Sequence, residues 1–184
     1  TRLRGLVLRA FTSRRIDSFE PEITDLCHKL IDGFHSDEID LLPSYANKIP
    51  VIIIARLLGM PEEMADQLLK WSNDMVMMYQ ARRTRALEDN AVTSTEEFVA
   101  FMRRYIEDKR NQPADDLITH LIAAEEDGAR LSTDEMISTC ILLLNAGHEA
   151  TVHTLGNGIK CLIKNGYRPS NLSSRSDIDL SLIH

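Results

Sequence analysis

The residues with the clearest chemical potential stand together at positions 146–151, which read AGHEAT. Glu149 is a charged residue that closely follows an apolar run, and a carboxyl group beside an apolar surface can hold or relay a proton. Gly147 costs a helix about 1 kcal/mol relative to alanine, so a glycine inside a helical pattern needs a structural or functional reason. The first hypothesis for this segment is therefore proton transfer beside a shallow surface.

One long helix is predicted to position these residues. Ser132 and Glu135 have the spacing of a capping box, and a helical apolar pattern continues from Glu135 to about Lys164. At about 100° per residue, one face of this helix carries mostly small side chains, namely Thr139, Leu143, Ala146, Gly147, Ala150 and Thr154. Glu149 borders this face on one side and Thr151 on the other.

Two interpretations of the small-residue face stay open at this point. The face can lie against something flat or bulky, with Glu149 as a proton donor beside it. Alternatively, its small residues can allow close packing against another helix while Glu149 lies in solvent. A zinc site is excluded, because His148 and His153 are five positions apart and so about 140° apart around a helix, and cannot share an ion.

The remaining bulk properties narrow the class of protein. The chain has 184 residues, a formal net charge of −7 and 43% hydrophobic residues, which indicates a globular domain and argues against a nucleic-acid surface. No apolar run approaches the roughly 20 residues needed to span a bilayer. The three cysteines, Cys27, Cys140 and Cys161, are too widely spaced for a disulfide framework or zinc site. We therefore expect a cytoplasmic protein in a reducing compartment.

The rest of the chain is expected to be helical with short breaks, which predicts a mainly α fold. Helices are predicted at residues 2–10, 13–34, 42–58, 61–79, 93–110, 116–126 and 135–164, with a polar loop at 81–92. Pro21 is expected to kink or divide the second helix. Gly59 is the predicted C-cap before Pro61, and Thr93 and Asp115 are the predicted N-caps of later helices.

Residues 146–151 resemble the oxygen-activation motif A-G-x-[D/E]-T-T of the cytochromes P-450, which lies in the longest helix (the I helix) of that family. Other segments resemble bacterial members in the same order along the chain: 1–4 with 10–12, 49–52 with 57–61, and 115–119 with 131–135. The resemblance spans nearly the whole chain. It implies a single partial domain over residues 1–184, from the family's C helix through the I helix to just before its E-x-x-R helix.

Three departures from the family pattern matter. The E-x-x-R helix and the loop with the haem-ligand cysteine are not found, so the chain is expected to be truncated at both ends and to hold no metal ligand. Glu107 and Arg110 have the E-x-x-R spacing but precede the long helix, and we interpret them as a chance match. Ala150 occupies the position of the family's relay threonine, whereas Thr151 matches the second threonine.

The resemblance implies a haem-dependent monooxygenase that uses O2, a small organic substrate and electrons from NAD(P)H through a ferredoxin-type redoxin. Arg4 would match the arginine that binds a haem propionate, and the arginine-rich start of the chain could attract an acidic ferredoxin. Ala146, Gly147 and Ala150 would lie against the haem.

Glu149, with Thr151 nearby, would help to deliver protons. Because the axial cysteine is not found, the chain is expected to be inactive as a monooxygenase alone. The alternative is a non-catalytic all-α binding or scaffold module that kept only the helical core.

Overall fold

A computed structural model describes residues 2–10, 13–126 and 129–167, and it confirms the mainly α prediction. The helices are α1 (Arg2–Ala10), α2 (Ser13–Asp32), η1 (Leu42–Ala46), α3 (Lys48–Leu57), η2 (Glu62–Met64), α4 (Ala65–Val76), η3 (Met77–Tyr79), α5 (Arg85–Asn111), α6 (Leu117–Ala123) and α7 (Thr133–Lys164). A hairpin of β1 (Glu125–Glu126) and β2 (Ala129–Arg130) precedes α7. Within these ranges, no helix is long and apolar enough to cross a membrane.

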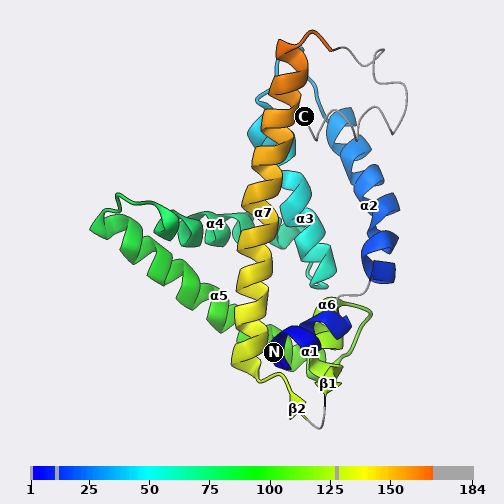
Figure 1. Ribbon diagram of the computed structural model, residues 1–184, viewed down its shortest axis with the longest axis vertical. Coiled ribbons are helices and arrows are strands. Elements are labelled where there is room, and N and C mark those ends of the chain that lie inside the picture. Colours follow the sequence, from blue (N-terminus) through cyan, green and yellow to red (C-terminus); the bar gives the residue numbers. More distant parts are fainter. Residues whose placement is uncertain (1, 11–12, 127–128, 168–184) are drawn as a thin grey trace.

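Helix α7 runs the length of the molecule, and η1, α3, α4 and α5 pack against it (Figure 1). It has 32 residues, so it is about 48 Å long at about 1.5 Å per residue. The predicted capping box is confirmed: the Ser132 hydroxyl accepts from the Glu135 backbone N–H, and the Glu135 carboxylate accepts from the Ser132 N–H at 2.8 Å. The helix thus begins at a defined residue and carries residues 146–151 at its middle.

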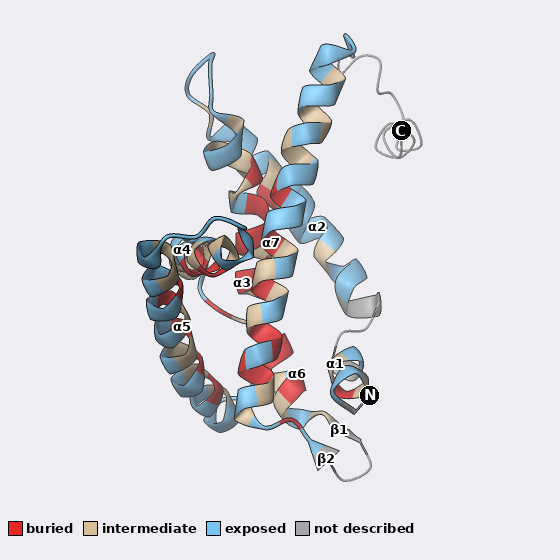
Figure 2. Ribbon diagram, turned by 60° about the vertical axis from the view of Figure 1, so that its left-hand side comes forward, coloured by how far each residue is buried: buried red, intermediate tan, exposed pale blue. Residues whose placement is uncertain are grey.

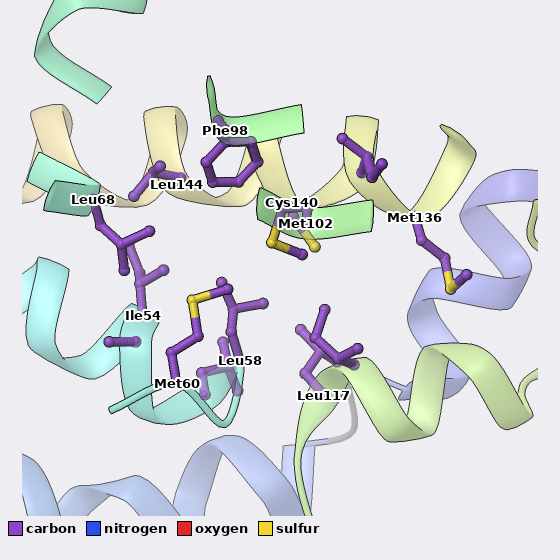
Figure 3. Close-up of a cluster of buried hydrophobic side chains, with 14 of the residues drawn as sticks. Ile54, Leu58, Met60, Leu68, Phe98, Met102, Leu117, Met136, Cys140 and Leu144 are labelled. Carbon is purple, nitrogen blue, oxygen red and sulfur yellow. The ribbon is translucent and has the colours of Figure 1, made fainter. Parts of the chain in front are cut away.

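The core lies on one side of α7, where helices α3, α4 and α5 approach it. Figure 3 shows Cys140 and Leu144 of α7 beside Leu58, Phe98 and Met102. The buried residues of α7 recur at helical spacing, and they are Met136, Ile137, Thr139, Cys140, Leu144, His148 and Val152. After Val152 the described part of α7 has no further buried residue, so the core holds mainly the first two thirds of the helix.

A buried carboxylate joins the end of α5 to the start of α6 and lies against the turn that follows α3. Asp116 is only 4% exposed and caps α6 by accepting from the Thr119 N–H at 2.8 Å. Its other oxygen lies 2.5 Å from the Lys109 ammonium of α5. Burial alone would lower the pKa of Lys109, but the hydrogen bond to Asp116 and the nearby Tyr105 raise it on balance. Tyr105 donates in turn to the carbonyl of Gly59, which follows α3.

The predicted loop at 81–92 is wrong, because α5 begins at Arg85. The Thr84 hydroxyl caps it by accepting a backbone N–H of the first turn at 3.3 Å. Thr93, the predicted cap, lies inside α5 and donates its hydroxyl to a carbonyl one turn earlier. Ala91 is buried against the core, so the polar residues around it are the solvated face of a helix rather than a loop.

Smaller differences concern helix ends. The N-cap of α6 is Asp116 rather than Asp115, and α6 ends at Ala123 because the chain then enters β1. The predicted end at Asp127-Gly128 lies outside the described residues. Pro21 does not divide α2, and the predicted helix at 42–58 is a π-helical turn followed by α3.

Replacing Gly59 by alanine should destabilise the fold by at least about 2 kcal/mol, because two penalties add. Gly59 has φ 71°, and a Cβ there would lie 2.4 Å from an Asp116 carboxylate oxygen. Gly166 is a matched control, since its φ is 69° but nothing lies within 4 Å of its Cβ position. Gly166→Ala should therefore cost only about 1 kcal/mol. Urea denaturation measures both, and equal losses would show that the contact with Asp116 is unimportant.

Candidate functional site

The middle of α7 has an apolar face that no part of the described chain buries. Leu142 is 66% exposed, and Ala146 and Ala150 follow it at intervals of four residues, both exposed. We call these three residues the open stripe. Figure 2 shows the exposed band on α7 beside the buried one. Leu144 and His148, on the opposite side, are buried. A leucine followed by two alanines leaves a low surface suited to a flat apolar partner.

Glu149 lies next to the open stripe, on the same turn as Ala146 and Ala150. Its side chain is 50% exposed, and one carboxylate oxygen lies 3.8 Å from Nε2 of His153, one turn further on. No second carboxylate is recorded at this position. The structure therefore brings together an exposed acid and an uncovered apolar surface.

Gly147 faces a different way from the open stripe. A Cβ at this position would lie 3.1 Å from Cδ1 of Ile54, so the missing side chain lets α3 pack closely against α7. Thr139 is likewise buried in the core, whereas Thr154 is exposed. Both interpretations of the small-residue face therefore apply, but to different residues: Gly147 allows helix packing, and Ala146 and Ala150 face outward.

The hydroxyl groups near the site are bonded within the helix. Thr151 donates to the carbonyl of Gly147 at 2.8 Å, and Thr154 donates to the carbonyl of Ala150 at 2.8 Å. Thr151 follows Glu149 by two residues, about 160° around the helix, and no bond between their side chains is recorded. The structure thus shows Glu149 and Thr151 on different sides of α7, without a bond between them.

The three cysteines all lie within helices, Cys27 in α2 and Cys140 and Cys161 in α7. Burial raises the pKa of the Cys140 thiol to about 12, so it stays protonated at neutral pH. Among the described residues, no group of three His, Cys, Asp or Glu side chains could hold a metal ion. Glu107 and Arg110, which match E-x-x-R by spacing, form an ion pair within α5.

Arg4 lies on a separate element from the α7 residues. Its side chain is exposed on α1, which is anchored by the buried Leu6 and packs against α6 and β1. In Figure 1 this places α1 near the beginning of α7. The side chains of the other arginines near the start of the chain lie outside those that the structure describes.

A buried polar cluster next to Glu149 was missed by the sequence analysis. His148 is 4% exposed, and its Nδ1 lies 3.5 Å from the hydroxyl of Ser72 in α4, which donates to the Asn145 side-chain oxygen at 3.1 Å. The sequence analysis considered His148 only as a zinc ligand. Its position four residues after the apolar Leu144, on the buried stripe, is the signal that could have found it.

Comparison with known proteins identifies one family to which the chain is similar. A family model described as cytochrome P450 matches residues 2–166. The vitamin D(3) 25-hydroxylase of Pseudonocardia autotrophica is 40% identical over 165 residues, which are 89% of this chain and 39% of that protein. Cytochrome P450 107B1 of Saccharopolyspora erythraea is 37% identical over 166 residues, 90% of this chain and 39% of that protein. The chain thus spans about two fifths of the length of these relatives.

A solved structure agrees with the sequence relatives. The ligand-free structure of cytochrome P450 TbtJ1 is similar with a TM-score of 0.87 at 32% identity, and the match covers 97% of this chain and 49% of that one. The similarity therefore extends over both the core helices and α7.

The open stripe predicts an asymmetry between two leucines on α7. Leu142→Ala should change the free energy of unfolding of this chain by less than about 0.5 kcal/mol, because the side chain is mostly exposed. Leu144→Ala should cost about 2–5 kcal/mol, because it leaves a cavity in the core. Chemical denaturation compares the two variants directly. A similar loss for both would mean that the stripe is packed against something in the isolated chain.

Proposed function

The chain belongs to the cytochrome P450 family, and from this premise we propose that it forms the part of a haem monooxygenase that lies over the oxygen-binding face of the haem. The open stripe beside Glu149 is the observation that carries this proposal. When bound, the haem would supply the redox chemistry, in which an organic substrate, O2, two electrons and two protons yield the substrate with one oxygen atom inserted and one water. The protein groups orient the reactants and manage the protons.

The residues of the open stripe fit a haem on this side. Leu142, Ala146 and Ala150 present a low apolar surface where a porphyrin plane can lie, and their exposure in this chain is otherwise costly. Gly147 contributes indirectly, because it holds α7 close to α3. Arg4 is exposed, and a guanidinium binds a propionate carboxylate through two parallel hydrogen bonds. The proposal assigns the axial ligand to none of the chain's cysteines, which lie in helices.

Glu149 is proposed to hold the proton that oxygen chemistry needs. Its carboxyl group lies beside the open stripe and remains half exposed, so it can exchange protons with solvent. Ala150 stands where the family has its relay threonine, and a methyl group neither donates nor accepts a proton. Thr151 cannot replace that threonine without breaking its bond to the Gly147 carbonyl. Proton transfer from Glu149 therefore has to use ordered water or a hydroxyl group of the substrate.

The proposed partners follow from the same premise. A small organic substrate and O2 would meet on the Glu149 side of the open stripe. Electrons would come from NAD(P)H through a ferredoxin-type protein. An exposed arginine such as Arg4 attracts an acidic partner, although the chain as a whole carries a net charge of −7. The attraction would therefore depend on local charge and would weaken with salt.

In a haem-loaded holoenzyme that contains this segment, Glu149→Gln should lower turnover roughly ten- to hundredfold, since general acid catalysis of this kind contributes at least that much. Substrate affinity should stay within about twofold, because Gln keeps the shape of Glu and removes only the ionisable group. Steady-state turnover and a spectroscopic substrate titration measure the two quantities. Unchanged turnover would show that protons do not pass through Glu149.

Ala150→Thr is the companion variant for that experiment. It restores the family's relay hydroxyl, and it should be tolerated or should increase the product formed per NAD(P)H consumed. Loss of activity with haem still bound would contradict the interpretation that position 150 only lacks the relay hydroxyl. It would show instead that Ala150 makes room for the substrate or its water.

A further inference from the structure

His148 has a buried nitrogen that nothing in the proposed mechanism uses. It lies on α7 directly before Glu149 and is 4% exposed. Its Nε2 is buried and has no hydrogen-bond partner among the residues that the structure describes. Its other ring nitrogen faces Ser72, a fully buried serine of α4. The ring therefore makes its polar contact with a neighbouring helix rather than with solvent.

The contacts of this cluster favour one tautomer of the His148 ring. The Ser72 hydroxyl has one hydrogen, which it donates to the Asn145 side-chain oxygen at 3.1 Å. The same hydroxyl oxygen can then accept from Nδ1–H of His148 at 3.5 Å, and we assign the hydrogen to Nδ1 and the lone pair to Nε2 on this basis. Burial lowers the pKa of His148, which favours the neutral ring, while the nearby Glu149 carboxylate raises it and His153 lowers it. A neutral imidazole leaves an unpaired lone pair rather than an unpaired buried N–H.

The cluster joins two elements across a long sequence separation. Ser72 belongs to α4, which packs on α5 and on α7 (Figure 1), whereas Asn145 and His148 occupy consecutive turns of α7. Both bonds thus run between α4 and the turn that precedes Glu149 and Ala150. A displacement of α4 would break both contacts. While both are formed, they limit how far α7 can rotate about its axis relative to α4.

We propose that neutral His148 is a positioning residue, which uses its Nδ1–H and Ser72 to tie α4 to the turn of α7 that carries Glu149. The role given to Glu149 rests on the proposed function, but the tie itself does not. His148 touches neither substrate nor haem in this assignment. It acts by limiting the orientations that the turn at 145–151 can adopt.

The test compares His148→Phe with His148→Asn in the haem-loaded holoenzyme. Phenylalanine fills the ring volume without a donor, whereas the asparagine amide nitrogen can donate from nearly the position of Nδ1. By hydrogen exchange with mass spectrometry, amides at 145–151 should exchange roughly three- to tenfold faster in His148→Phe, the effect of losing one hydrogen bond. His148→Asn should restore most of the protection.

Ser72→Ala removes the other half of the tie with a smaller change in volume, and it keeps the experiment decisive if His148→Phe does not fold. It should also accelerate exchange at 145–151, and the double variant should add little to either single one. Ser94→Ala is the matched control: Ser94 is a buried serine of α5 that donates to Asp74 of α4 at 2.5 Å. It should lower stability without changing exchange at 145–151.

Unchanged exchange in both His148→Phe and Ser72→Ala would overturn the proposal. Failure of His148→Asn to restore protection would also overturn it, because the ring would then act by packing alone. If exchange changes as expected but Glu149→Gln leaves turnover intact, the tie stands and the proposed role of Glu149 fails. The two proposals are therefore tested by separate readouts.

Discussion

The ion pair between Asp116 and Lys109 is the interaction on which the arrangement of the helices depends most directly. A carboxylate that is 4% exposed costs several kcal/mol unless it is paired, so its partners are tightly constrained. Lys109 comes from the end of α5, the Thr119 N–H from the start of α6, and the carboxylate leaves no room for a side chain at Gly59 after α3. The crossing of α3, α5 and α6 is thereby fixed, and two of these helices, α3 and α5, pack on α7.

The candidate site is exposed because the core packs against only one side of α7. The core covers one side of the helix through Cys140, Leu144 and their neighbours, and helices α3, α4 and α5 fill that side (Figure 3). The other side keeps the open stripe and Glu149. A helix held firmly on one face can present a precisely oriented surface on the other, which is what a rigid cofactor requires. The same helix thus supplies both the scaffold and the chemistry.

Sequence reasoning predicted those features that depend on local physics. The capping box of α7 and the left-handed turn at Gly59 are each set by a few neighbouring residues. It failed where contacts between residues far apart in the sequence determine the local structure. The polar stretch at 85–92 is helical and buries Ala91 against the core, and the direction of Gly147 depends on Ile54 of α3. Helical spacing gives the direction in which a residue points from the helix axis, but it does not give the helix or strand that packs against that side.

The contact between Gly147 and Ile54 has an evolutionary consequence. The distal methyl group of Ile54 lies within 3.1 Å of where a Cβ at position 147 would stand, so the two positions share a single small volume. A larger residue at position 147 requires Ile54 to shift by a few tenths of an ångström, and a smaller residue at position 54 removes that requirement, because packed interiors tolerate best the exchanges that conserve total volume. We therefore expect correlated divergence at these sites, in which loss of Ile54 eases the later loss of the glycine.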